Sequence, residues 1–193
     1  MARKQKGFSL IELLVVMAIA LIIASYAMIN IQQGLKNARI ANAYDTLISE
    51  LRNARQIAVD RRQTTRVTFT APYTITTATK DVGAGTYTTQ RTITIGNDLQ
   101  FQTLAGFPNT ATTVPDGFGA GATAVDFNGG AVVNFQPDGT AVDATGAVVN
   151  GVVYIARTGD LASARAVTMY GATGRIKGWR LLKVGSTWTW LKY

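Results

Sequence analysis

The chain has 193 residues and a formal net charge of +8, from 19 lysine and arginine residues against 11 aspartate and glutamate residues. It contains no histidine and no cysteine, which excludes thiol nucleophiles, disulfides, Cys/His metal sites and Ser-His-Asp catalytic triads. Hydrophobic residues make up 47% of the chain and charged residues only 16%, so it is too apolar for a disordered tail. The length fits one domain with an appendage.

The first 35 residues predict a membrane-inserting helix. Residues 1–7 carry three positive charges and no negative charge, and Glu12 is the only charged residue within residues 8–35. The uncharged run 13–35 contains 23 residues. As a helix it would be ~34 Å long, enough to cross the ~30 Å hydrocarbon core of a bilayer. Because basic residues precede it, we expect the amino end in the cytoplasm and the rest of the chain beyond the membrane.

Two kinds of processing fit this segment. An ordinary secretory signal would be cut near the small residues 18–20 or after Ala27, which would release a soluble secreted protein. Alternatively, the hydrophobic helix is retained. Glu12 favours retention, because a carboxylate in an apolar helix costs a few kcal/mol on insertion and a secretory signal has no use for it.

Residues 7–12, Gly-Phe-Ser-Leu-Ile-Glu, resemble the cleavage and methylation motif of prepilins. The resemblance implies that a separate prepilin peptidase cuts the leader, residues 1–7, between Gly7 and Phe8, and that the new N-terminal Phe8 is methylated. It also implies that Glu12 pairs with the free N-terminal amine of a neighbouring subunit in a filament. Such a pairing would offset the cost of burying either charge alone. Residues 8–35 would then be a transmembrane and filament-core helix.

Residues 36–62 predict an amphipathic helix that continues from the hydrophobic one. No proline occurs before Pro72, so both parts can form one rod with Gly34 as the weak point. Polar residues separate apolar ones that recur at steps of three and four. These apolar residues are Ala38, Ala41, Tyr44, Leu47, Ile48, Leu51, Ala54 and Ala58.

Residues 63–193 predict a β-rich globular domain. Threonine supplies 17 of the 50 residues 64–113, and the apolar spacing changes to two, as in half-exposed strands. A surface loop is expected at residues 106–121. The fold class is therefore α+β, with the long helix packed on an antiparallel sandwich or pair of sheets. Strands are expected at residues 66–70, 73–79, 86–95, 99–103, 131–136, 147–157, 164–170, 175–184 and 187–191.

A more specific resemblance covers three stretches of the globular part. Residues 47–69, the turn 135–140 and residues 174–177 resemble the GspH/FimT group of minor pseudopilins and minor pilins. The resemblance implies a low-copy filament subunit of a type II secretion pseudopilus or a type IV pilus, involved in filament assembly and protein secretion. It implies an inner-membrane, single-pass location, with the globular domain in the periplasm or on an extracellular filament. The implied partners are other pilin or pseudopilin subunits, the prepilin peptidase, an inner-membrane assembly platform and membrane lipid.

The carboxyl end carries a candidate binding face. No acidic residue follows Asp160, whereas six basic residues and all three tryptophans do. In a strand, period two places Arg175, Lys177 and Trp179 on one face, beside Arg180, where phosphates and a base could bind. Residues 174–177 also resemble the Gly-Arg-x-Arg motif of pilins that capture DNA, with lysine in the last place. Alternatively, the tryptophans are packing residues and the basic residues form a solvated edge.

The sequence predicts no enzyme, cofactor or metal site. Asp138 with Gly139, and Asp143, lack the spacing of an EF-hand, and Asp-Gly is an ordinary turn pair. The glycine-rich runs lack the strand-to-helix context of nucleotide sites, and no motif pairs carboxylates for acid-base catalysis. The remaining hypotheses are a filament subunit, a pilus-borne DNA receptor and a secreted β-domain.

Overall fold

The computed structural model describes residues 9–96, 98–119 and 121–193, so Gly7 and Phe8 lie outside the described residues. The chain divides into two compact units, Met1–Arg39 and Ile40–Tyr193. Each unit is described by itself below.

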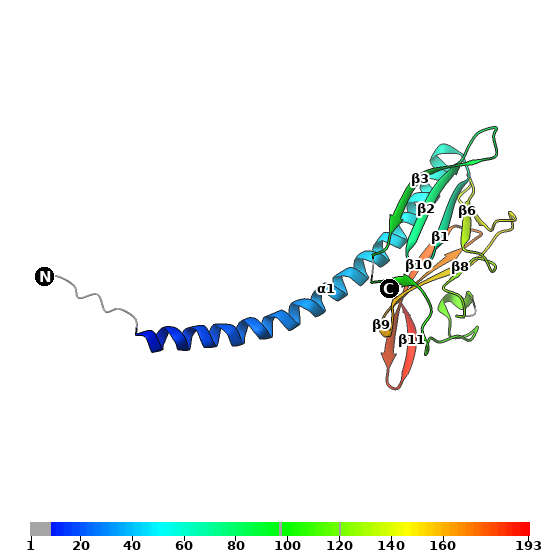
Figure 1. Cartoon of the computed structure of the whole chain (residues 1–193). Coiled ribbons are helices and arrows are strands. Elements are labelled where there is room, and N and C mark those ends of the chain that lie inside the picture. Colours follow the sequence, from blue (N-terminus) through cyan, green and yellow to red (C-terminus); the bar gives the residue numbers. More distant parts are fainter. Residues whose placement is uncertain (1–8, 97, 120) are drawn as a thin grey trace. The chain divides into compact units, whose positions relative to one another are not determined.

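The helix α1 (Leu10–Arg61) is a single element of 52 residues that contributes to both units (Figure 1). Gly34 does not interrupt it, because one glycine costs only about 1 kcal/mol relative to alanine in a helix interior. The helix ends in a Schellman motif. Arg62 adopts a left-handed φ of 52°, while the backbone N–H groups of Arg62 and Gln63 donate to the carbonyls of Val59 and Ala58.

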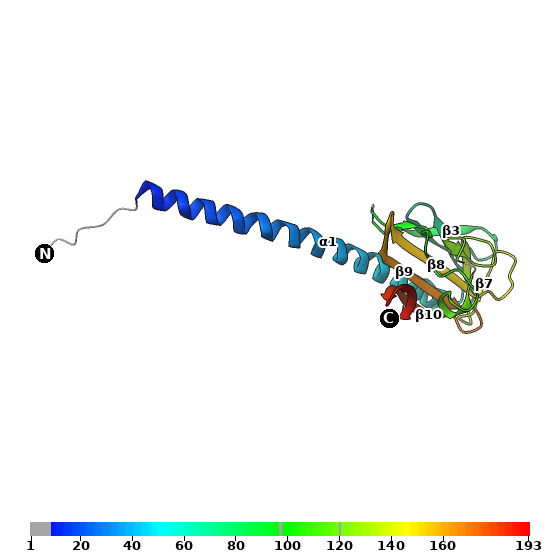
Figure 2. The same cartoon turned by 90° about the horizontal axis from the view of Figure 1, so that it is seen from below.

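The second unit contains two antiparallel sheets, which confirms the α+β prediction. The first has the order β3-β2-β1-β6-β7 and the second the order β11-β10-β9-β8-β4, with β5 paired to β8. Figure 2 shows β8, β9 and β10 side by side. The first sheet contains β1 (Thr65–Thr70), β2 (Thr74–Lys80), β3 (Tyr87–Thr94), β6 (Val132–Phe135) and β7 (Ala141–Val142). The second contains β4 (Gln100–Phe101), β5 (Val125–Asp126), β8 (Gly151–Arg157), β9 (Asp160–Tyr170), β10 (Arg175–Val184) and β11 (Thr187–Lys192).

The main core lies between the second half of α1 and the inner faces of both sheets. Leu47, Leu51 and Ala54 are fully buried there with Val133 and Val153 from the two sheets. The expected phase of the helix was wrong at its start, because Ala38 and Ala41 are exposed and Ile40 and Ala43 are buried instead. The larger side chains of Ile40, Tyr44 and Leu47 determine which face of the helix meets the sheets.

A second core covers the outer face of the second sheet. It consists of Phe107, Val152, Tyr154, Ala156, Ala164, Ala166, Leu181 and Trp190. The segment 106–121 is therefore more than the surface loop expected from sequence. Phe107, Val114 and Pro115 are buried, and a short 3₁₀ helix, η1 (Pro115–Gly117), interrupts the segment. The aromatic and proline side chains of this glycine-rich segment could have indicated that it covers the sheet.

Several strand limits also differ from the expectation. The strands β5 and β7 were not predicted, since each has two residues, which are too few to show a period. Strand β8 begins at Gly151 rather than at 147, and β9 begins at Asp160 rather than at 164. Cross-strand pairing of Arg157 with Asp160 extends the β8–β9 hairpin into the predicted turn.

Candidate functional site

The described part of the first unit is an apolar helix segment with no protein cover. In residues 9–28 and 31–39 every side chain is exposed, and by length and composition this part of α1 could cross a membrane. Glu12 is exposed in the first turn, where the positive end of the helix dipole stabilises a carboxylate. An apolar surface of this extent requires lipid or other helices as neighbours.

Residues 47–69, the turn 135–140 and residues 174–177 meet around one arginine. Arg55 of α1 donates from Nε to the carbonyl of Gly139, at 3.1 Å. A Cβ on Gly174 would overlap that carbonyl and lie 2.5 Å from Arg55 Nε. Gly139 and Gly174 both have left-handed φ values, of 84° and 59°. These glycines are therefore required for close packing of two turns on the helix.

The predicted face on β10 contains a hydrogen-bonded network. Lys177 Nζ lies 2.6 Å from Asp116 Oδ1, and Thr168 Oγ1 donates to Asp116 Oδ2, also at 2.6 Å. Trp179 Nε1 in turn donates to Thr168 Oγ1 at 2.9 Å. The structure thus brings Lys177 and Trp179 together as period two predicts, but Asp116 neutralises the lysine.

The side chains of the other two residues of the predicted set, Arg175 and Arg180, form no described hydrogen bond with this network. Arg175 is exposed at the start of β10. Arg180 alternates with Trp179, so its side chain lies on the opposite face of the strand. In the register of β10 and β9, Arg180 lies directly opposite the buried Arg165. Burial, and next the charge of Arg180, lower the pKa of Arg165.

A separate cavity of about 330 Å³ lies where β10 meets α1 and the end of the chain. Arg52, Arg175, Lys177 and Lys192 line it, with Asp45 as its acidic side chain, so Arg175 and Lys177 meet at this cavity. Tyr44 forms one wall, and its ring contacts that of Tyr193 at 5.4 Å between centroids. The lining is therefore predominantly basic.

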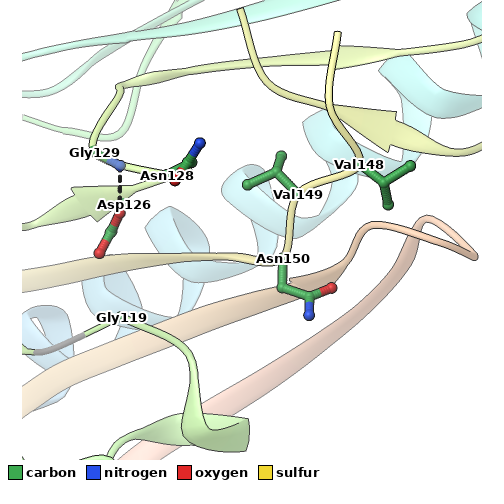
Figure 3. A pocket seen from close by; sticks show the side chains of 7 residues that line it. All are labelled: Gly119, Asp126, Asn128, Gly129, Val148, Val149 and Asn150. Carbon is green, nitrogen blue, oxygen red and sulfur yellow. Dashed lines mark hydrogen bonds between the residues drawn. The ribbon is translucent and has the colours of Figure 1, made fainter. Parts of the chain in front are cut away.

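Another cavity, of about 510 Å³, is formed by turns of the second unit (Figure 3). Its polar side chains maintain the turns around it. Asp126 Oδ1 accepts from the Gly129 N–H, and Asn150 Oδ1 accepts from the Gly171 N–H, both at 2.9 Å. Asn128 donates to Asp143. Among the described residues, no group of three or more His, Cys, Asp or Glu side chains could hold a metal ion.

Asp143 is surrounded by donors. Its Oδ1 accepts from the N–H and the hydroxyl of Thr145 at 2.8 and 2.6 Å, and from the N–H of Ala147 at 3.1 Å. Its Oδ2 accepts from Asn128 Nδ2 at 2.9 Å. Hydrogen bonds from Thr145 and then from Asn128 hold the pKa of this carboxyl well below its ordinary value of 3.8.

Acidification is expected to destabilise the second unit in part through Asp143. The pKa of Asp143 is lower in the folded state than in the unfolded state, so its ionised form stabilises the fold above about pH 5. This stabilisation is lost as the pH falls, first through the pKa of the unfolded state and then through that of the folded state. We expect Asp143→Asn to lower the free energy of unfolding at pH 7 and to flatten its decrease between about pH 5 and pH 2. Denaturant titrations of the full chain, followed by tryptophan fluorescence, measure this. The exposed Asp45→Asn is the charge-matched control, and equal pH slopes for wild type and Asp143→Asn would contradict the assignment.

Comparison with known proteins identifies a sequence motif in the N-terminal segment. Residues 2–28 match the family model described as the prokaryotic N-terminal methylation motif. The chain is pilin-like in this segment. The motif includes Gly7, Phe8 and Glu12, and so confirms the resemblance of residues 7–12 to prepilins. The chain is also similar to a crystal structure of the type IV minor pilin FimU of Pseudomonas aeruginosa, at 15% identity and a TM-score of 0.48, over 77% of this chain and 91% of that one. No curated protein matches the chain.

The methylation motif accounts for only one end of the chain. It does not reach Arg175, Lys177, Trp179 or Arg180, whose roles stay predictions. Sequence reasoning missed Asp116 and Thr168, the partners of Lys177 and Trp179. Asp116 lies 61 residues before Lys177 in a glycine-rich segment, so no local pattern could have indicated the pairing.

Proposed function

We propose that the chain is a minor subunit of a bacterial pilus or pseudopilus, with a structural and not an enzymatic role. The observation that carries this proposal is the methylation motif at residues 2–28, which includes an apolar helix segment whose described side chains are all exposed. In this proposal Gly7 and Phe8 flank the peptidase cleavage site, Phe8 is the methylated residue and Glu12 acts in filament assembly. The leader, the membrane helix, the amphipathic helix and the β-rich domain occupy residues 1–7, 8–35, 36–62 and 63–193.

The physical properties of the first unit suit such a subunit. A helix that is apolar on all sides is stable in lipid and also among other apolar helices in a filament core. Transfer from the membrane to the filament would thus change the burial of the helix little. The subunit would be held in the inner membrane by one helix, with its β-domain in the periplasm or on an extracellular filament. The assembly platform and the other subunits would be its partners.

Two machines remain as alternatives. A GspH/FimT-type subunit serves either a type II secretion pseudopilus or a type IV pilus, and both use this plan. Neighbouring genes for a secretin with exported hydrolases would favour secretion, whereas genes for pilus retraction and competence would favour a pilus.

Processing at Gly7 is the first test of the filament role. In a host with a prepilin peptidase, we expect a mature chain of 186 residues, the 193 residues less the seven of the leader, with a methylated Phe8 at its start. Mass spectrometry of the N-terminal peptide measures this, and a host without the peptidase should yield the uncut chain. A mature chain that begins after Ala20 or Ala27 would instead identify a secreted β-domain.

DNA binding is a second candidate function, favoured by the basic cavity beside β10. Arg52, Arg175 and Lys192 line it, while Arg180 lies exposed on the same strand as Arg175. Phosphate contacts by such residues make binding strongly dependent on salt.

We expect the full chain in detergent to bind duplex DNA more weakly as salt increases, and Arg175→Ala with Arg180→Ala to reduce this affinity about tenfold or more. Lys80→Ala, an exposed lysine on β2 that does not line this cavity, is the control. Fluorescence anisotropy of a labelled duplex measures the affinity. Unchanged binding by the double variant would exclude Arg175 and Arg180 as DNA-binding residues.

A further inference from the structure

A groove of about 380 Å³ separates the segment 108–117 from the hairpin of β10 and β11. All three tryptophans of the chain line it. Leu181 pairs with Trp190 and Lys183 with Trp188 across the hairpin, so period two places Trp179, Trp188 and Trp190 on one face. The opposite wall consists of Pro108, Thr112, Thr113, Val114, Pro115, Asp116 and Gly117.

The aromatic wall is held in place before any ligand arrives. Trp190 is 6% exposed and contacts the rings of Phe107 and Tyr154, at centroid distances of 5.4 and 5.5 Å. Trp179 is anchored by its hydrogen bond to Thr168. Trp188 remains half-buried at the groove. Indole faces that are already ordered lose little entropy when a flat apolar surface stacks on them.

The polar groups that line the groove carry no net charge once the Asp116–Lys177 ion pair is counted. Most of them can accept hydrogen bonds. Asp116 is compensated by Lys177 at 2.6 Å, so the lining itself offers no net charge to an ion. Lys183 is exposed opposite Trp188 on the same face but is not part of the lining. Each Asp116 oxygen accepts one described hydrogen bond and retains a further lone pair. Thr112, Thr113 and Thr189 add hydroxyl groups. The N–H of Trp179 is already donated to Thr168, while the buried N–H of Trp190 has no acceptor among the described residues.

We propose that this groove binds a neutral carbohydrate. A sugar ring has an apolar face that can stack on Trp188 and hydroxyl groups that can donate to Asp116 and the threonines. A proline-rich peptide also binds aromatic grooves, but it offers carbonyl acceptors that need an accessible indole N–H. The N–H of Trp179 is occupied and that of Trp190 is buried, which leaves Trp188 alone among the three indoles for such a donation. The Asp116 oxygens and three threonine hydroxyls can accept from a sugar, so the groove matches sugar hydroxyls better. This inference is independent of the filament role.

The test uses the full chain in lipid nanodiscs, which avoids detergents with sugar headgroups. Maltotetraose, cellotetraose, chitotetraose and a decaproline peptide are titrated separately, with saturation-transfer NMR and tryptophan fluorescence as readouts. We expect saturable binding of at least one tetrasaccharide, weakened about tenfold by Trp188→Ala and less by Trp188→Phe. Leu191→Ala, an exposed change on the opposite face of β11, is the control and should leave binding unchanged.

Three results would overturn the proposal. One is no binding of any of the three tetrasaccharides, and another is binding of decaproline in their place. The third is binding of a tetrasaccharide that neither Trp188→Ala nor Thr112→Val, a change on the opposite wall, weakens.

Discussion

Replacing Glu12 with alanine is expected to leave the chain in the membrane and to remove it from filaments. The substitution makes the apolar segment more hydrophobic, so insertion should not suffer. If Glu12 pairs with the N-terminal amine of a neighbouring subunit, its loss leaves that amine without a counter-charge in an apolar filament core, which costs several kcal/mol. We therefore expect at least about a tenfold reduction in the variant recovered with sheared filaments, at unchanged membrane content.

Matched variants distinguish charge pairing from a packing defect. Glu12→Gln keeps the shape and removes the charge, so it should fail like Glu12→Ala, whereas Glu12→Asp should retain part of the incorporation. Val15→Ala, a change in the same apolar segment, should assemble normally. Normal recovery of Glu12→Ala with the filament would exclude the pairing, although it would leave the cleavage at Gly7 untouched.

Replacing Gly178 with alanine is expected to destabilise the second unit strongly. Gly178 is buried in β10, directly beneath the ring of Tyr44 on α1, and a Cβ at this position would overlap the phenol oxygen. The ring of Tyr44, or the helix that carries it, would have to move away from the second sheet. Overpacking of this kind costs about 3 kcal/mol, which lowers Tm by roughly 10 °C in a chain of this size. Thermal unfolding followed by tryptophan fluorescence measures the change.

Two further variants make this expectation specific. Tyr44→Leu removes the atoms that a Cβ would meet, so Tyr44→Leu with Gly178→Ala should be more stable than the two single effects predict. Gly130→Ala is the control, since a Cβ there has no neighbour closer than the Phe127 carbonyl at 3.5 Å. A Tm for Gly178→Ala equal to that of wild type would show that Tyr44 does not seat the helix on this strand.

Local patterns predicted most of the elements. A proline-free run that changes from wholly apolar to apolar at every third or fourth residue predicted α1, because helix formation depends on neighbours within one or two turns. Alternation in threonine-rich stretches predicted β1, β2 and β3 within one or two residues, and the stretch 175–184 between two turns predicted β10. The short strands β5 and β7 were missed, since their pairing is chosen by distant partners and not by their own residues.

The candidate binding residues show where such patterns stop being informative. Period two brought Lys177 and Trp179 to one face, but the same period excludes Arg180 from it. Whether Lys177 is free to bind a phosphate depends on Asp116, which approaches from the segment 106–121. That segment covers the outer face of the second sheet because Phe107 and Pro115 become buried on folding.

The sequence by itself determined the N-terminal methylation motif, the apolar helix and the α+β class, because each depends on residues close together in the chain. Only the tertiary structure decided that Arg55 joins two distant turns, that Asp116 neutralises Lys177 and that three tryptophans line one groove. These features join residues that are far apart in sequence. Their contacts are selected by the burial of whole faces and by the satisfaction of buried polar groups, and neither leaves a periodic signal in the chain.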